Sequence, residues 1–265
     1  AMRVLTDPAD TGAVCVALPQ DVEAEAYDYP EYFFRKRVWH MDRRPITDRQ
    51  LEQAIDLISN SKKPLLICGG GVRYSEAWKD LQKFAEEFNI PIGETQAGKG
   101  LIAWDHPLNL GGIGVTGTKA ANLIARDADL IIGVGTRFTD FTTNSKWGFR
   151  NPECKILAIN VCSFDAVKMD AEGILADARE TLSAIRKELK NLNYQSKYTD
   201  EIIEAKKEWD DIVNEYYNLP EEKNGIPQTR ALGEINRFMR SKDIAVGSAG
   251  SLPGDMQRLF RPGKP

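Results

Sequence analysis

Two short apolar runs, each ending in a glycine-rich turn, constrain the fold of this chain more than any other feature. The first run leads into Gly69–Gly71 and the second into Gly135. Each has the length of a buried strand, and glycine allows the tight turn and close backbone approach that then follow. A third glycine cluster, Gly111–Thr118, opens a helical pattern. This alternation predicts an α/β fold with a doubly wound parallel sheet, whose strand ends form a crevice.

Strand and helix patterns alternate from residue 47 to residue 189. The stretch Thr47–Gln50 has the form of a capping box, in which a hydroxyl and an amide satisfy backbone groups at the start of a helix. Apolar spacing then separates helical stretches from short buried strands. We predict strands at 64–68, 90–93, 129–134 and 155–160, and helices at about 47–58, 75–88, 117–126 and 177–189.

The segments outside this alternation look like parts of neighbouring domains. Residues 13–18 and 244–247 are apolar and rich in β-branched residues, which predicts a buried strand in each. Residues 199–217 and about 228–239 have helical patterns. Ala1 before Met2 resembles the remnant of an expression tag, and we expect a piece of a longer protein. The expected division is 1–45, an upstream domain end and connector; 46–190, the central α/β domain; 191–227, a helical linker; and 228–265, the truncated start of a downstream domain.

Charge and composition argue against several classes of partner. The formal net charge of −4 gives no general attraction to nucleic acid or anionic lipid. No apolar run approaches the roughly 20 residues of a membrane-spanning helix, and the chain shows no secretory leader. The four cysteines lack a C-x-x-C pair, which favours buried thiols in a reducing cytoplasm. We therefore expect a cytoplasmic protein with no nucleic-acid or membrane partner.

The glycine clusters are the candidate binding site. Gly112, Gly114 and Gly117 match the G-x-G-x-x-G dinucleotide fingerprint, but residues 105–110 before them look like a loop rather than the required strand. An ordinary NAD fold is therefore disfavoured. A different nucleotide crevice would use backbone amides and a guanidinium to hold phosphate. The residues that would form it are Gly70, Gly71, Gly114, Thr118, Gly135 and Arg137. The simpler interpretation, which we favour, is that the glycines only make tight turns.

Other candidates for chemistry are sparse. His40 and His106 have no carboxylate or cysteine at ligand spacing, so we assign no metal site and no catalytic residue. The small-residue turn containing Ser248, Gly250 and Ser251 follows the strand predicted at 244–247. Turns at strand ends often face a ligand.

Several stretches follow one another in an order that matches a known family. They are Gly12–Val22, Lys62–Gly71, Thr95–Gly100, Asp105–Pro107, Gly114–Thr118, Ala128–Leu130 and Gly135–Phe138. Together they resemble the family of thiamine-diphosphate-dependent enzymes. Within that family, Glu94–Lys99 with Trp104–Leu110, and Ser251–Gln257, are similar to members that use water to open a cyclic trihydroxy diketone in inositol breakdown. The acetolactate synthase group is the nearest competitor.

The resemblance implies a three-domain parent in which a pyrimidine-binding and a diphosphate-binding domain flank this central domain. The parent would use thiamine diphosphate and Mg²⁺ and form a homodimer or homotetramer. Its activating glutamate and its magnesium motif would both lie outside these residues, so this fragment should hold neither cofactor and be inactive. Ser248, Gly250 and Ser251 would form a diphosphate-side loop. FAD is not expected, because Asn160–Ser163 lacks the acid that meets adenosine in flavin-containing relatives.

Three alternatives remain open from the sequence. The chain could be a fragment of an acetolactate synthase-type enzyme that condenses 2-keto acids. It could also be a stand-alone nucleotide-binding module that uses Gly70, Gly114 and Arg137. The aromatic connector at 27–39 suggests a third, a non-catalytic interaction domain.

Overall fold

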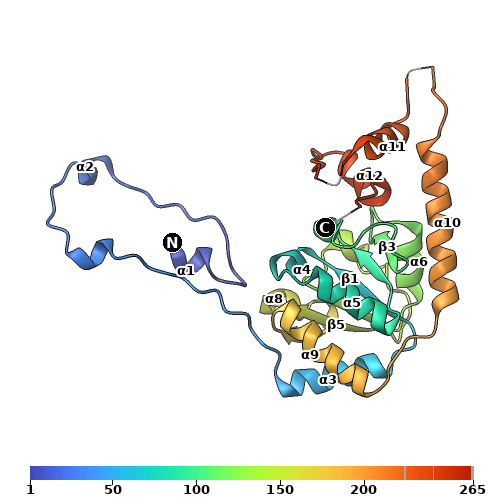
Figure 1. The fold of residues 1–265 in the computed structure, drawn as a ribbon, viewed down its shortest axis with the longest axis horizontal. Coiled ribbons are helices and arrows are strands. Elements are labelled where there is room, and N and C mark those ends of the chain that lie inside the picture. Colours follow the sequence, from blue (N-terminus) through green and yellow to red (C-terminus); the bar gives the residue numbers. More distant parts are fainter. Residues whose placement is uncertain (224, 241, 264–265) are drawn as a thin grey trace. The chain divides into compact units, whose positions relative to one another are not determined.

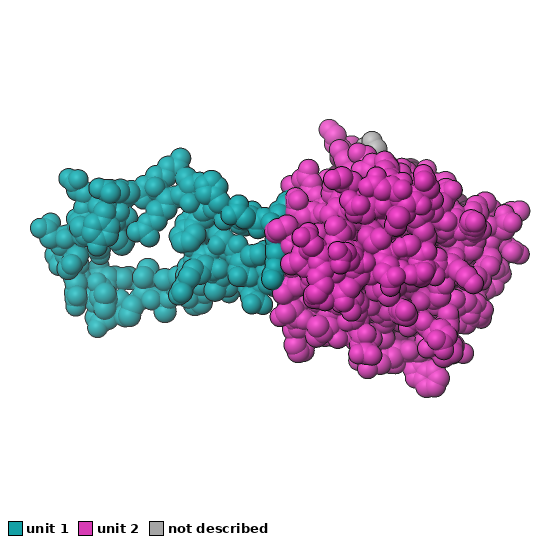
Figure 2. Space-filling model, turned by 90° about the horizontal axis from the view of Figure 1, so that it is seen from below, with its two compact units in different colours: residues 1–44 teal, residues 45–265 magenta. Residues whose placement is uncertain are grey.

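A computed structural model describes residues 1–223, 225–240 and 242–263. Its contacts divide the chain into two compact units, residues 1–44 and residues 45–265 (Figure 2). The first unit contains only short helices: α1 (Met2–Leu5), α2 (Gln20–Glu23) and η1 (Glu31–Phe34). In the described residues, no helix combines the length and apolar character needed to cross a membrane. The four-part domain division remains a prediction.

The second unit is built on a six-stranded parallel sheet with the strand order β3-β2-β1-β4-β5-β6 (Figure 1). The chain starts in the middle of the sheet, builds one half outward and then returns to build the other. The order reverses between β1 and β4, and this is the place where such sheets form a crevice. The predicted doubly wound α/β fold is therefore confirmed. The strands are β1 (Pro64–Cys68), β2 (Ile92–Glu94), β3 (Asn109–Gly112), β4 (Leu130–Val134), β5 (Lys155–Asn160) and β6 (Glu172–Leu175).

Helices pack beside this sheet in two groups. One group contains α3 (Asp48–Ser59), α5 (Trp78–Phe88) and α9 (Ala178–Asn191), with α9 in contact with both of the others. In the other, the long α10 (Thr199–Tyr217) runs along α6 (Lys119–Asp127) and β3 (Figure 1). The predicted capping box at the start of α3 is confirmed. Shorter helices follow the strands: α4 (Gly70–Tyr74), η2 (Gln96–Gly98), α7 (Asp140–Thr143), α8 (Ser163–Ala166) and η3 (Lys168–Asp170). The C-terminal segment adds α11 (Gln228–Phe238) and α12 (Leu252–Leu259).

The core lies between the sheet and these helices. Every residue of β1 and β4 is buried, as expected for central parallel strands covered on both faces. On α5, Phe84 and Phe88 stack edge to face with ring centroids 4.9 Å apart, and both are buried. The apolar runs that precede the glycine turns thus supply the centre of the hydrophobic core.

Two predicted strands are wrong. Residues 13–18 and 244–247 adopt no regular structure, and most of their side chains are exposed. A strand is stable only when its backbone groups pair with a neighbour, and neither segment pairs with a strand in the described chain. The prediction that the cysteine thiols are buried is wrong for Cys15, which lies in the segment 13–18 and is exposed. Cys68 is buried, and Cys154 and Cys162 are partly buried.

Two observed strands were missed. β3 begins at Asn109, within the stretch interpreted as a loop, and β6 lies in a stretch for which no element was predicted. The sequence of β3, Asn-Leu-Gly-Gly, has little β propensity. Pairing with β2 extends it instead, with Ile92 opposite Asn109 and Glu94 opposite Gly112. The fingerprint at 112–117 therefore does follow a strand, so the absence of a leading strand no longer counts against it.

The ion pair between α5 and α9 should make stability depend on pH in acid. Arg186 donates two hydrogen bonds to Glu87, at 2.5 and 2.7 Å, and Lys190 lies 3.0 Å away. The Arg186 guanidinium is the main cause that lowers the pKa of Glu87 to about 2. The stability that this ion pair adds to the folded protein is fully present above pH 4.5 and is lost as the pH falls towards 2.

We expect Glu87→Gln to cost about 1 kcal/mol at pH 7, because both partners are partly exposed. At pH 2 the cost should nearly vanish. Urea unfolding of wild type and variant at both pH values measures this difference. An equal cost at both would show that the carboxylate charge plays no part.

Candidate functional site

The two glycine turns at the switch point pack directly against each other. The Gly69 amide donates to Val134 O at 2.9 Å, and the Gly71 amide donates to Gly135 O at 3.0 Å. Gly135 has φ +59°, in the left-handed region that favours glycine. A Cβ on Gly71 would lie 2.6 Å from Gly135 Cα. The structure thus brings Gly71 onto Gly135, whereas Gly70 faces the Ala97 side chain. Two amides in these turns already donate to protein carbonyls.

The third cluster meets the segment that follows β4. Gly114 has φ +94°, and a Cβ there would lie 1.9 Å from Phe141 O. Thr118 is buried; its hydroxyl donates to Leu110 O at 2.7 Å and accepts from the Ala121 amide at 3.0 Å, which caps α6. Thr118 therefore has a structural role. Arg137 differs: it is exposed, and it has no hydrogen-bond or ion-pair partner in the described ranges.

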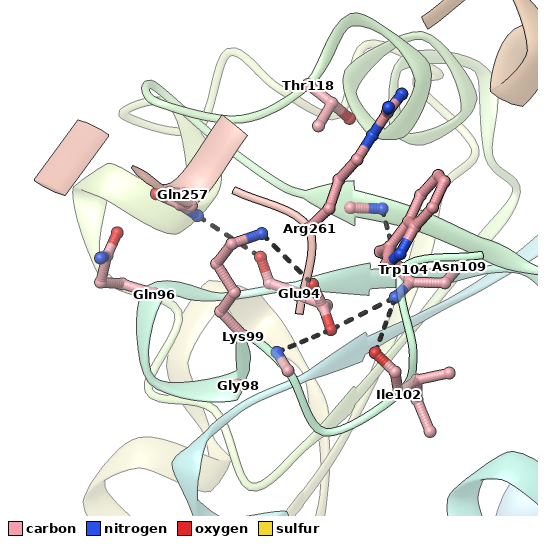
Figure 3. Close-up of polar contacts among 12 residues, drawn as sticks. Glu94, Gln96, Gly98, Lys99, Ile102, Trp104, Asn109, Thr118, Gln257 and Arg261 are labelled. Carbon is pink, nitrogen blue, oxygen red and sulfur yellow. Dashed lines mark hydrogen bonds and ion pairs between the residues drawn. The ribbon is translucent and has the colours of Figure 1, made fainter. Parts of the chain in front are cut away.

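A buried carboxylate that the sequence argument did not select lies at the end of β2. Glu94 is 1% exposed. Its Oε1 accepts from the Gly100 amide at 3.1 Å and from Asn109 Nδ2 at 3.4 Å (Figure 3). Burial raises the pKa of Glu94 above its usual value, against the opposing effects of Lys99 and these donors. The sequence did contain a signal for this site, because Glu94 is a charged residue directly after the apolar run at 90–93.

Lys99 is the counterion of Glu94. Its Nζ lies 3.9 Å from Glu94 Oε2 (Figure 3), and burial lowers the pKa of the ammonium group although Glu94 opposes that shift. Asn109 also donates to Ile102 O at 3.1 Å and to Ala103 O at 3.2 Å. The cluster fixes the loop between β2 and β3. A buried, partly compensated ion pair of this kind favours one specific loop geometry.

The C-terminal segment lies against the same strand ends. The Gln257 amide nitrogen donates to Glu94 O at 3.4 Å (Figure 3). It also donates to Ile113 O at 3.2 Å. The Arg261 guanidinium lies 4.3 Å from the centre of the Trp104 ring. The turn with Ser248, Gly250 and Ser251 is exposed directly before α12. It is not part of the glycine contacts at the switch point.

Among the residues that the structure describes, no three His, Cys, Asp or Glu side chains gather as a metal site. His106 instead pairs with Glu86, with Nε2 3.0 Å from Oε1. The site as it stands holds a loop in place and presents the exposed guanidinium of Arg137 at the carboxyl edge of the sheet.

Comparison with known proteins gives a consistent match. Residues 51–185 match the family model described as the central domain of thiamine pyrophosphate enzymes. The chain is 52% identical to a 3D-(3,5/4)-trihydroxycyclohexane-1,2-dione hydrolase of Clostridium tetani, with 99% of the chain and 44% of the relative covered. It is 53% identical to the Clostridium perfringens protein of that name, over 98% of the chain and 44% of the relative. The Bacillus cereus counterpart is 50% identical, over 100% and 45%. The chain thus spans somewhat less than half the length of these relatives.

Proposed function

Since this chain belongs to the thiamine pyrophosphate enzyme family and carries its central domain, we propose that its parent protein hydrolyses a C–C bond of a trihydroxycyclohexane-1,2-dione. The observation that carries this proposal is the identity of 50–53% along nearly the whole chain to hydrolases named for that substrate. The acetolactate synthase-type alternative is not favoured. Because the chain covers less than half of those relatives, most of the catalytic machinery would lie in other parts of the parent.

The residues present fit thiamine diphosphate only at its anionic end. The turn before α12 offers the hydroxyls of Ser248 and Ser251. Its backbone is open at Gly250, where φ is +115° and a Cβ would meet no atom within 4 Å. Hydroxyls and backbone amides are suitable donors to phosphate oxygens. When bound, the cofactor supplies an electron sink for C–C cleavage. Magnesium finds no matching ligand set in the described residues.

Within the parent protein, the role of this chain is to hold the flanking catalytic domains in fixed positions. The hydrogen-bonded loop around Glu94 and the sheet beside it provide the support. Large apolar side chains are exposed on segments that follow β4 and β5: Phe141 by 68%, Trp147 by 71% and Phe164 by 74%. Exposed apolar patches commonly mark protein contacts. We therefore propose that this edge contacts the flanking domains or a second subunit of a homo-oligomer.

The substrate assignment is tested with the full-length protein, thiamine diphosphate and Mg²⁺. We expect this protein to open the ring of the inositol-derived diketone. The reaction is measured as the loss of the diketone and the appearance of an open-chain acid. We expect no acetolactate from pyruvate. Acetolactate formation without diketone turnover would contradict the hydrolase proposal and support the synthase. The 265-residue chain, assayed in parallel, should be inactive.

We propose that the glycine crevice of Gly70, Gly71, Gly114, Thr118, Gly135 and Arg137 is structural and does not retain FAD. The basis is that Gly71 and Thr118 already have protein partners and that Asn160 donates to Thr136 O at 2.9 Å, where an acid would meet adenosine. Calorimetric titration with FAD, NAD and coenzyme A should give no heat. Saturable binding that Arg137→Ala abolishes would establish a nucleotide site instead.

A further inference from the structure

Two sequence stretches far apart in the chain meet at the ends of β2 and β3. One is Glu94–Lys99, and the other is Ser251–Gln257 within and before α12. Gln257 is 4% exposed, although glutamine is usually found at the surface. Besides its two bonds to backbone carbonyls, it accepts a hydrogen bond from the Thr116 hydroxyl. All three partners belong to the central sheet and its loops.

The backbone of β3 is shaped to admit this side chain. A Cβ on Gly112 would lie 2.7 Å from Gln257 Cγ and 3.0 Å from Gln257 O. Gly112 does not have a positive φ, so glycine is needed there for space and not for backbone conformation. A Cβ on Gly254 would similarly lie 2.9 Å from Thr116 Cγ2. The first turn of α12 thus lies against the Thr116 side chain, and its middle lies against Gly112 of β3.

Contacts at both ends of α12 complete the attachment. In the first turn of α12, Pro253 O accepts a hydrogen bond from Gln96 Nε2 at 3.4 Å. After its end, the Trp104 amide donates to Pro262 O at 3.1 Å, and Arg261 donates to Asn214 Oδ1 at 2.7 Å and to Asp210 O at 3.0 Å. By contrast, the turn of Ser248, Gly250 and Ser251 is exposed and continues directly into α12. Among these contacts, Gln257 is the side chain of α12 that is buried against the central sheet.

We propose that Gln257 is a positioning residue, through which the central domain sets the place of the Ser248–Ser251 turn and thereby the affinity for the diphosphate group of thiamine diphosphate. This inference rests on the proposed function for its ligand. It makes the central domain a determinant of cofactor affinity and not only a spacer. Gln257 is buried and acts through the position of α12.

The test compares two variants that disturb one contact from opposite sides, in the full-length protein. Gln257→Leu removes the buried amide, and Gly112→Ala displaces it from the β3 side. Loss of one buried hydrogen-bonding group corresponds to roughly a tenfold change in an equilibrium constant. We expect each variant to raise the Kd for thiamine diphosphate about tenfold, measured by calorimetry with Mg²⁺ present.

The matched control is Ile185→Val, a fully buried substitution on α9, which packs on α3 and α5. It lowers stability without touching α12, and its Kd should equal that of wild type. Unchanged Kd values in both test variants would overturn the proposal. An equal rise in all three proteins would also overturn it, because the effect would then reflect general destabilisation.

A second measurement separates this inference from the proposed function. Hydrogen exchange of the α12 amides, including Phe260 N bonded to Met256 O, should be about tenfold faster in Gln257→Leu without cofactor. If the wild-type protein binds no thiamine diphosphate, the proposed function fails, and the exchange rates still decide whether Gln257 positions α12. Unchanged exchange would reject the positioning role whatever the cofactor result.

Discussion

Replacing Gly69 by alanine should destabilise the protein by about 3 kcal/mol, because the added methyl group meets only backbone atoms. Its Cβ would lie 2.2 Å from Gly135 O and 2.7 Å from Thr136 Cα. Gly69 has φ −114° and ψ −175°, an extended conformation that alanine also adopts, so the cost is steric alone. Relief requires β1 and β4 to move apart at the switch point. Denaturant unfolding should show a lower midpoint with an unchanged slope.

The neighbouring glycine is the control. A Cβ on Gly70 would first meet the Ala97 methyl group at 3.2 Å, a contact that small shifts relieve. Gly70 is also the first residue of α4, where alanine is the better helix former. Gly70→Ala should therefore change stability by less than about 1 kcal/mol. If both substitutions cost the same, the packing of the two glycine turns described above is incorrect.

Replacing Asp129 by asparagine should cost about 3 kcal/mol, since one carboxylate organises the entry to β1. Its oxygens accept from the Lys62 amide at 2.7 Å, the Lys63 amide at 3.0 Å and the Ser61 hydroxyl at 2.5 Å. An asparagine turns an NH₂ group towards one of these donors and removes the charge that strengthens the other bonds. Thermal and denaturant unfolding of the variant measure the loss.

Asp127 offers a matched comparison two residues away. It is exposed and pairs with Arg126 on the surface, with Nη2 2.6 Å from Oδ2. Surface pairs contribute little, so Asp127→Asn should change stability by less than about 0.5 kcal/mol. A similar loss in both variants would mean that overall charge, and not the specific bonds of Asp129, determines the effect.

The sheet was predictable because its central strands carry their own signal. β1, β4 and β5 are apolar runs of strand length, and burial on both faces requires that composition. β3 and β6 carry no such signal, since they lie at the sheet edges and depend on a neighbour for pairing. The reverse error occurred at 13–18 and 244–247, where an apolar pattern exists without a partner strand in the described chain. Local pattern specifies a strand only when the fold supplies its pair.

The site was less predictable, because its contacts are long-range. The glycine clusters were correctly selected as close-packed turns, yet the sequence could not show that Gly71 donates to Gly135 and not to a ligand. Glu94 and Gln257 are 163 residues apart and meet only in the folded chain. The family resemblance identified both stretches as distinctive. Only the structure shows that they touch.

The central claim is that this chain supports a cofactor site that other parts of the parent complete. Calorimetric titration with thiamine diphosphate and Mg²⁺ tests it most directly, on the 265-residue chain and on its full-length parent. We predict saturable binding by the full-length protein. We predict no measurable heat with the 265 residues alone. Equal affinity in both proteins, or none in the parent, would contradict this central claim.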